Sequence, residues 1–387
     1  MSAKNNIRIL VVAGEESGDR LAARALAEVK NHCNSKGVTT DLYGIGGNHC
    51  KALGVRCYHH ADEMSVVGFA EVASRYFFFK RVLREMVNLL DSPATRPDVL
   101  FLVDYPGFNL PLAREAKKRG IRVVFYVSPQ VWAWKSSRIK KIVASVSEMV
   151  VIFPFEAKLY LDAGLAHTYF VGHPLLEIIE QERNTFSSRE AFGLIHGLDA
   201  SKQWLAIFPG SRNEEVRRHQ ETMCNAAIIF CKKHNFQPVF VESESVAADK
   251  YSPFPSINHF RSAGDVHELM FHADLGILKS GTTTLEAALM GLPGVICYKT
   301  SVLTYQIAKR LIKLPFIGLA NIVLGRKLYP ELIQDDFQQA NIVTALDSVL
   351  MNASTFSTEL KQITNILQSP DGSPSLRVAE ILLGDVQ

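Results

Sequence analysis

Short runs of Val, Ile, Leu and Phe that alternate with longer helical patterns constrain this 387-residue chain more than any other feature. Such apolar runs, bounded by polar residues, Gly or Pro, are typical of strands buried on both faces of a parallel sheet. In the first half of the chain, the runs cover residues 7–13, 98–103, 122–127 and 149–153. Helical patterns cover residues 19–30, 79–90, 112–119 and 136–144. This βαβ repetition predicts a doubly wound α/β domain.

The same alternation returns in the second half of the chain. Strand-like runs cover residues 204–208, 238–242, 275–278 and 294–298. Helical patterns cover residues 214–233, 266–272, 283–290 and 304–312. Ligands bind at the carboxyl ends of parallel strands, so two such sheets in series create a binding cleft. The sequence therefore predicts an α/β fold with two Rossmann-like doubly wound domains and an interdomain cleft.

The expected domain limits follow from the same pattern. We place the first domain at residues 1–172 and the second at residues 173–353, with a joint at Gly172-His173-Pro174 or within residues 181–188. Residues 354–387 form a helical segment. The sequence leaves open whether this segment stays on the second domain or crosses back onto the first.

Composition narrows the class of protein. A formal charge of +3 is too small for strong electrostatic attraction to nucleic acid, so no nucleic-acid partner is expected. The six cysteines form no Cys-x-x-Cys pair, which favours a reducing compartment. No window reaches the ~18 apolar residues of a membrane-spanning helix. The histidines form no recognisable metal set. We therefore expect a cytoplasmic protein without metal or cofactor, whose membrane contact is peripheral.

Acidic residues follow two strands of the first predicted domain. The loop after the first strand contains Glu15, Glu16, Ser17 and Asp19. Its carboxylates suit sugar hydroxyls better than a pyrophosphate, although Ser17 or Asp19 as a plain helix cap explains the loop equally well. Asp104 comes directly after the strand at 99–103, where a carboxylate can take a proton from an attacking hydroxyl. The alternative for Asp104 is a helix cap or a turn residue.

Two loops of the second predicted domain suit a phosphate. Gly210, Ser211 and Arg212 lie between a strand and a helix, and offer backbone amides and a fixed cation. The stretch Ser280-Gly281-Thr282 has the same setting, with Glu286 one turn into the following helix. The first loop is otherwise an ordinary turn, and the second an ordinary Ser/Thr cap. Two such loops in one domain favour a nucleotide site.

Two stretches combine aromatic and basic residues. One runs from residue 64 to residue 84, and the other surrounds residues 132–141. Aromatic rings beside cations suit a bilayer interface, and the alternatives are a core helix and a solvated helix face. The candidate contact residues are Val66, Val67, Phe69, Phe77, Phe78, Trp132 and Trp134.

Several of these motifs together resemble one family, the lipid-A-disaccharide synthases, along nearly the full chain. The most specific match is Ser-Pro-Gln-Val-Trp-Ala-Trp at 128–134. Others are Ala-Gly-Glu-Glu-Ser-Gly-Asp at 13–19, Asp-Tyr-Pro-Gly-Phe-Asn at 104–109, Pro-Gly-Ser-Arg at 209–212 and Pro-Glu-Leu-Ile-Gln at 330–334. Shorter matches lie at 44–47, 67–72, 153–156, 171–174 and 280–282, with Glu286 and Asn321.

This resemblance implies a GT-B glycosyltransferase of lipid A and lipopolysaccharide biosynthesis, on the inner face of a Gram-negative inner membrane. The donor is UDP-2,3-diacylglucosamine, and the acceptor is the 6-hydroxyl of 2,3-diacylglucosamine 1-phosphate. The β-1,6 link forms with inversion, without a metal, and releases UDP. The oligomeric state stays open, with a homodimer as one option.

The resemblance also implies roles for individual residues. Asp104 is the expected base, with Glu15 and Asp19 in the same catalytic group and Ser17 facing the acceptor. The other expected roles belong to the UDP site. Gly210, Ser211, Arg212 and residues 280–282 bind the diphosphate, Glu286 binds the ribose, and Asn321 and Gln334 line the uridine side.

Three other functions remain alternatives at this point. UDP-N-acetylglucosamine 2-epimerases share the two-domain plan, but they need no lipid contact. A transferase that adds N-acetylglucosamine to a lipid-linked precursor is the second alternative. The third is a lipid-binding protein without catalysis, against which the presence of Asp104, Arg212 and Glu286 argues.

Overall fold

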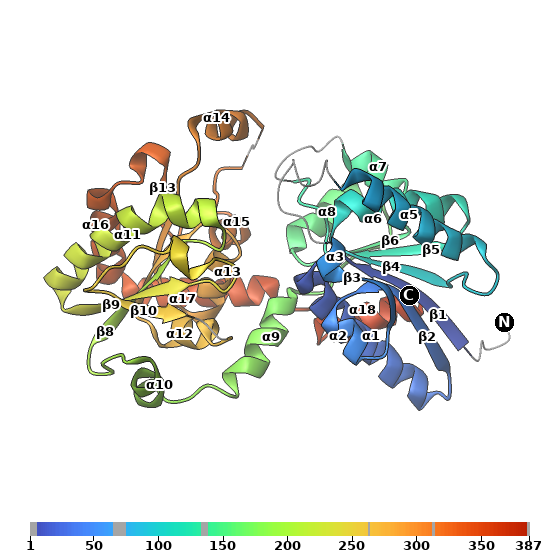
Figure 1. Cartoon of the computed structure of the whole chain (residues 1–387), viewed down its shortest axis with the longest axis horizontal. Coiled ribbons are helices and arrows are strands. Elements are labelled where there is room, and N and C mark those ends of the chain that lie inside the picture. Colours follow the sequence, from blue (N-terminus) through green and yellow to red (C-terminus); the bar gives the residue numbers. More distant parts are fainter. Residues whose placement is uncertain (1–5, 65–74, 133–137, 262–263, 312–313, 385–387) are drawn as a thin grey trace. The chain divides into compact units, whose positions relative to one another are not determined.

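The computed structural model describes residues 6–64, 75–132, 138–261, 264–311 and 314–384. The chain divides into two compact units, residues 1–174 with 369–387, and residues 175–368. In each unit, helices cover a parallel sheet (Figure 1). The expected pair of Rossmann-like domains is confirmed, whereas the interdomain cleft stays a prediction. No described helix is long and apolar enough to cross a membrane.

The first unit contains a seven-stranded parallel sheet in the order β3-β2-β1-β4-β5-β6-β7. The strands are β1 (Asn6–Ala13), β2 (Thr39–Gly46), β3 (Arg56–His60), β4 (Val99–Val103), β5 (Arg122–Tyr126), β6 (Glu148–Val151) and β7 (Thr168–Phe170). The helices are α1 (Glu16–Ser35), α2 (Asn48–Ala52), α3 (Ala61–Met64), α5 (Tyr76–Asp91), α6 (Pro106–Lys118), α7 (Ile139–Val143) and α8 (Pro154–Asp162).

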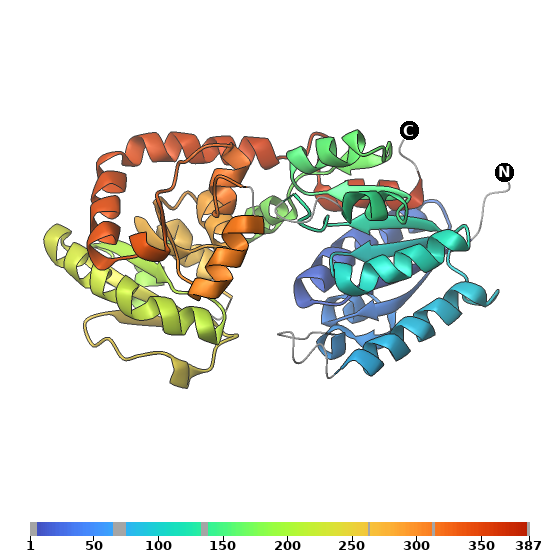
Figure 2. The same cartoon turned by 90° about the horizontal axis from the view of Figure 1, so that it is seen from above.

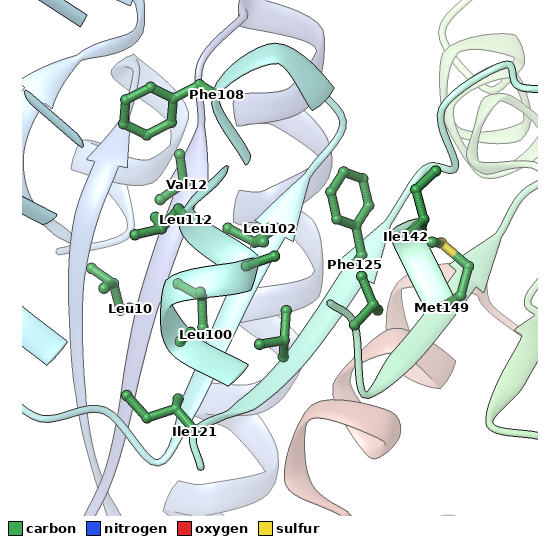
Figure 3. Close-up of a cluster of buried hydrophobic side chains, with 14 of the residues drawn as sticks. Leu10, Val12, Leu100, Leu102, Phe108, Leu112, Ile121, Phe125, Ile142 and Met149 are labelled. Atoms are coloured by element: carbon green, nitrogen blue, oxygen red, sulfur yellow. The ribbon is translucent and has the colours of Figure 1, made fainter. Parts of the chain in front are cut away.

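The core of this unit shows why its strands appear as apolar runs. Alternate residues of β1 and β4, such as Leu10 and Leu100, point to one face and pack against Leu112 of α6 (Figure 3). Phe125 of β5 and Ile142 of α7 extend the same layer. The neighbouring residues along the strands are also buried, because α1 covers the other face. Each such side chain contributes roughly 1.5–3 kcal/mol of burial free energy.

The end of the chain belongs to both units. Helix α17 (Ala353–Leu367) stays with the second unit, whereas α18 (Pro374–Leu383) belongs to the first and packs along α1. Both views show the last helix among the strands and helices of the first unit (Figures 1 and 2). The Arg122 side chain fixes it by donating to Leu382 O at 2.8 Å, while it pairs with Glu148 at 2.6 Å. The expected helical segment 354–387 is thus divided between the units.

The second unit contains a six-stranded parallel sheet in the order β10-β9-β8-β11-β12-β13. The strands are β8 (Gln203–Phe208), β9 (Phe236–Glu242), β10 (Asn258–Arg261), β11 (Leu275–Lys279), β12 (Gly294–Tyr298) and β13 (Glu331–Ile333). The helices are α9 (Pro174–Arg183), α10 (Arg189–His196), α11 (Asn213–His234), α12 (Val266–His272), α13 (Thr283–Met290), α14 (Val302–Leu311), α15 (Leu319–Leu324) and α16 (Gln339–Met351).

Each sheet has one point where the strand order reverses, between β1 and β4 in the first unit and between β8 and β11 in the second. At the first point, Ala13 and Val103 are register partners and are the last residues of their strands. At the second point, Phe208 pairs with Leu278. Doubly wound sheets bind ligands beyond the strand ends at such switch points. The loops after β1 and β4 contain Glu15 and Asp104. The loops after β8 and β11 are the two predicted phosphate loops.

Candidate functional site

Asp104 and Glu15 are the carboxylates of the first switch point. Asp104 follows β4 and is half-buried, and Glu15 is exposed at the N-cap position of α1. Burial raises the pKa of Asp104 to about 6, and repulsion from the Glu15 carboxylate acts in the same direction. A carboxyl group whose pKa lies near neutrality can both accept and hold a proton, as a general base must.

The backbone at Asp104 is strained. Asp104 and Tyr105 have φ angles of 46° and 47°, a region that costs residues with side chains about 1–2 kcal/mol each. Two contacts hold the strained turn. The Asn109 amide donates to Asp104 O at 2.7 Å, and the Tyr105 hydroxyl donates to Met64 O at 2.7 Å. Such strain is characteristic of functional sites. Here the strained turn fixes the backbone position from which the Asp104 side chain extends.

Asp19 and Ser17, the other predicted residues of this loop, lie in different environments. Asp19 is 1% exposed, and its carboxylate accepts from the amides of Gly47 at 2.7 Å, His49 at 2.8 Å and Cys50 at 3.2 Å. It therefore holds the start of α2 against α1, which makes it a positioning residue in this structure. Ser17 is exposed in the first turn of α1, beside Glu15.

Trp132 lies in a cluster of aromatic side chains that follows β5 and β6. Its indole N–H donates to Glu156 Oε1 at 2.9 Å, and its ring meets that of Phe155 edge-on at 5.1 Å. Glu156 is 1% exposed, and burial raises its pKa to about 7. Its other oxygen accepts from Phe153 N at 3.2 Å at the start of α8. Trp134 lies outside the described residues.

Glu156 lies in the matched stretch 153–156, but sequence reasoning assigned it no role. A Glu three residues after the first helix-flanking residue, with Pro154 between them, supplies one half of a capping box, because the Phe153 side chain accepts no hydrogen bond. That pattern explains one carboxylate oxygen only. The contact with Trp132 joins residues 24 positions apart and depends on the packing of the loops beyond β5 and β6.

Helix α5 presents part of the predicted aromatic-basic surface. Phe77 is 81% exposed and Tyr76 is 54% exposed, and the exposed cations Lys80 and Arg81 follow in the next turn. Phe78 is only half-buried and lies beneath the Arg75 guanidinium at 4.6 Å. The other predicted contacts here, Val66, Val67 and Phe69, lie outside the described residues.

The second switch point carries both predicted phosphate loops. Gly210 has a φ angle of 133°, and Ser211 and Arg212 are exposed before α11 begins. In the other loop, Gly281 has a φ angle of 153°, and exposed Thr282 precedes α13. The Ser280 hydroxyl is not free for a ligand, because it donates to Ile317 O at 2.9 Å.

A pocket of about 380 Å³ lies beside these loops. It is lined by Phe208, Pro209, Gly210, Ser211, Val241, Glu242, Ser243, Glu244, Ser245, Gly264, Val266, Met270, Thr283 and Glu286. Gly210, Ser211 and Glu286 of the predicted UDP site line this pocket, whereas Arg212 and residues 280–282 are not among its lining residues. The size falls within the range of small-molecule sites. The walls combine apolar side chains, which suit a flat ring, with three carboxylates, Glu242, Glu244 and Glu286, which suit hydroxyl groups.

Asn321 and Gln334 do not line this pocket, contrary to the expected uridine contact. Asn321 is fully buried, donates to Tyr329 O and Glu331 Oε1 at 2.9 Å each, and accepts from two backbone amides. Gln334 accepts from Thr300 N at 2.7 Å and donates to Thr300 O at 3.2 Å. The polar atoms of both side chains form hydrogen bonds within the protein, and these bonds support loops near the strand ends.

The structure also reveals an ion pair that the sequence motifs did not indicate. Lys279 ends β11 and lies 2.7 Å from Glu215 of α11. Glu215 also accepts from Ser211 N at 3.2 Å. The pair therefore links the two phosphate loops. Among the residues that the structure describes, no cluster of three or more His, Cys, Asp or Glu could hold a metal ion.

Comparisons with known proteins identify the family. The family model for lipid-A-disaccharide synthetase matches residues 9–378. The lipid-A-disaccharide synthase of Trichlorobacter lovleyi is 36% identical over 386 residues, or 98% of each chain. That of Syntrophus aciditrophicus is 38% identical over 359 residues, or 89% of each chain.

Solved structures share the fold at low identity. A UDP-N-acetylglucosamine 2-epimerase from Neisseria meningitidis, bound to UDP-GlcNAc, has a TM-score of 0.61 and 11% identity, covering 98% of this chain and 99% of its own. The glycotransferase of kitacinnamycin has a TM-score of 0.61 and 14% identity over the whole of both chains. At these identities the similarity shows the fold alone. The family model and the close relatives show more, namely that this chain belongs to the lipid-A-disaccharide synthase family of glycosyltransferases.

Proposed function

We propose that this chain transfers 2,3-diacylglucosamine from its UDP ester to the 6-hydroxyl of 2,3-diacylglucosamine 1-phosphate. The products are the β-1,6-linked disaccharide 1-phosphate, with inverted configuration at the anomeric carbon, and UDP. The observation that carries the proposal is Asp104, a half-buried carboxyl group with its pKa raised to about 6 at a switch point of a chain of this family. An inverting transfer needs such a base on the acceptor hydroxyl.

The first unit handles the acceptor in this proposal. Asp104 takes the proton of the 6-hydroxyl as the oxygen attacks the anomeric carbon. Burial first and the Glu15 charge second raise the pKa of Asp104. Glu15 also lies where it can contact sugar hydroxyls, with Ser17 beside it. Asp19 holds the loop through backbone amides of residues 47–50. Trp132, fixed by Glu156, is the proposed wall for the acceptor at the neighbouring strand ends.

The second unit handles the UDP donor. The pocket of about 380 Å³ takes the uracil ring between its apolar side chains, and Glu286 accepts from the ribose hydroxyls. The diphosphate lies at Ser211, Arg212 and the start of α13, where a cation and backbone amides offset the charge that develops on the leaving group. We expect the reaction to need no metal ion.

We further propose that α5 contacts the inner-membrane surface from the cytoplasmic side. Both substrates carry acyl chains, so an enzyme that uses them benefits from lying on the bilayer. Exposed Phe77 and Tyr76 can enter the interface, while Lys80 and Arg81 meet lipid phosphates. Phe78 supports this surface from beneath.

Phe77→Ser should weaken binding to vesicles that contain anionic lipid by about tenfold or more, because a buried Phe contributes roughly 1.5–3 kcal/mol. Co-sedimentation with vesicles measures the change, and thermal unfolding should be unaffected. Leu194→Ser is the matched control, since Leu194 is 85% exposed but lies on α10 of the second unit. Equal vesicle binding by wild type and Phe77→Ser would remove α5 from the proposed contact.

The test of the activity is UDP release from UDP-2,3-diacylglucosamine in detergent micelles, with and without the acceptor. We expect release only with the acceptor, together with a new disaccharide phosphate identified by mass. Turnover of UDP-N-acetylglucosamine alone, without activity on the acylated pair, would contradict the proposal and point to an epimerase.

A further inference from the structure

The Lys279–Glu215 ion pair lies where the two phosphate loops meet. Lys279 is the last residue of β11, directly before Ser280, and Glu215 is the third residue of α11. Their side chains are only 16% and 12% exposed, and Nζ lies 2.7 Å from Oε1. The second carboxylate oxygen of Glu215 accepts from Ser211 N at 3.2 Å. The Glu215 carboxylate therefore binds both the Lys279 ammonium group and a loop amide at the second switch point.

The glycines of both loops show how near the pair lies to the loop surface. A Cβ atom on Gly210 would lie 2.7 Å from Glu215 Oε2, and one on Gly281 would lie 3.3 Å from Lys279 Nζ. A charged atom of Glu215 thus lies next to Gly210, and one of Lys279 lies next to Gly281, two positions that have no side chain. Gly210 also lines the pocket. Lys279 Nζ thus lies close to Gly281, in the loop where the diphosphate is proposed to bind.

Stability alone does not explain such a pair. Burying two charges costs about as much free energy as their attraction returns, and an apolar pair of similar size is often equally stable. A buried lysine at a loop that receives a doubly charged ligand has a more direct use. Arg212 is an exposed cation of the first phosphate loop, and a single cation leaves much of the charge of a diphosphate uncompensated.

We propose that Lys279 is a second cation for the donor diphosphate, and that Glu215 competes for it. With the site empty, Glu215 holds the ammonium group. With UDP bound, the ammonium group is shared with the phosphate oxygens, so Lys279 favours departure of UDP from the sugar while Glu215 limits how tightly the product is retained. This inference rests on the proposed use of a UDP donor.

The test compares UDP and uridine binding to three single variants of the full chain. Lys279→Met should weaken UDP by about tenfold or more, the usual effect of losing a charged hydrogen bond, and should leave uridine unchanged. Glu215→Gln keeps an oxygen for Ser211 N but frees the lysine, so UDP should bind more tightly. The control is Lys233→Met, which breaks a pair of the same 2.7 Å length with Asp347 at the far end of α11.

Opposite signs for the two variants distinguish this proposal from a purely structural role. If Lys279→Met and Glu215→Gln both weaken UDP and uridine to the same extent, the pair only fixes the loops and the proposal is wrong. If wild type binds UDP and neither variant changes its affinity, the proposal also fails while the proposed function stands. Absence of UDP binding to wild type would overturn both. Thermal unfolding of each variant shows whether it is folded.

Discussion

Asp104→Asn is expected to lower turnover by roughly 10²–10⁴-fold, the usual contribution of a general base. The amide keeps the shape of the side chain but cannot take the proton of the acceptor hydroxyl. The affinity for UDP should be unchanged, because every residue of the proposed UDP site lies in the second unit. Steady-state kinetics with both substrates, together with UDP titration, separate the two effects.

The pH profile of wild type gives an independent check. The base must be ionised, so kcat/KM should fall as the pH drops through about 6, the pKa of Asp104. Glu15→Gln should move this fall to lower pH, because the Glu15 charge is one cause of the raised pKa. The control is Asp162→Asn, since Asp162 is an exposed partner of Lys158 at the end of α8. Equal losses of UDP affinity and turnover in Asp104→Asn would exclude a role as base.

The same pKa also predicts a gain in stability for the inactive variant. Asp104 has a higher pKa in the folded chain than its usual value near ~4, so the folded state binds the proton more tightly. Stability therefore decreases as the pH rises from about 4 to about 6, and the full cost is present above 6. Asp104→Asn removes this cost, so its free energy of unfolding should exceed that of wild type at pH 8 and approach it near pH 4.

The sequence predicted the strand-end loops well, for a physical reason. Strands such as β4 and β8 are buried on both faces, so they read as unbroken apolar runs, and the first polar residue after each run marks the carboxyl edge. Asp104 is such a residue, and the turn Pro209-Gly210-Ser211 directly follows the run of β8. In contrast, β2 (Thr39–Gly46) begins with polar residues and contains two glycines, and the pattern did not predict it.

Contacts between distant residues were beyond the sequence. Nothing near Lys279 indicates that its partner is Glu215, because the contact depends on β8 and β11 being neighbours at the switch point. Asn321 shows a second limit of the sequence. A polar residue in a family motif was expected at the ligand, but its amide satisfies backbone groups of residues 328 and 329 and the Glu331 carboxylate. Motif membership alone does not separate a ligand contact from a loop support.

Gly210→Ala should weaken UDP binding by about 10²-fold, the effect of losing two hydrogen bonds to a charged ligand at about 1.5 kcal/mol each. The φ angle of Gly210 is 133°, which side chains rarely allow. A new Cβ atom would also lie 2.6 Å from Glu215 Cβ, and Glu215 is held in place by Lys279 and Ser211 N. The loop must therefore move away from its place beside the pocket.

Gly197→Ala separates this clash from backbone strain in general. Gly197 also has a positive φ angle, 67°, at the end of α10, but a Cβ atom there would meet nothing within 4 Å. Gly197→Ala should lose about 1–2 kcal/mol of stability from strain and keep wild-type UDP affinity. Titration with UDP and thermal unfolding of both variants measure the difference. A folded Gly210→Ala protein with wild-type UDP affinity would mean that the diphosphate does not lie at this loop, because the clash leaves the loop no way to keep its present position.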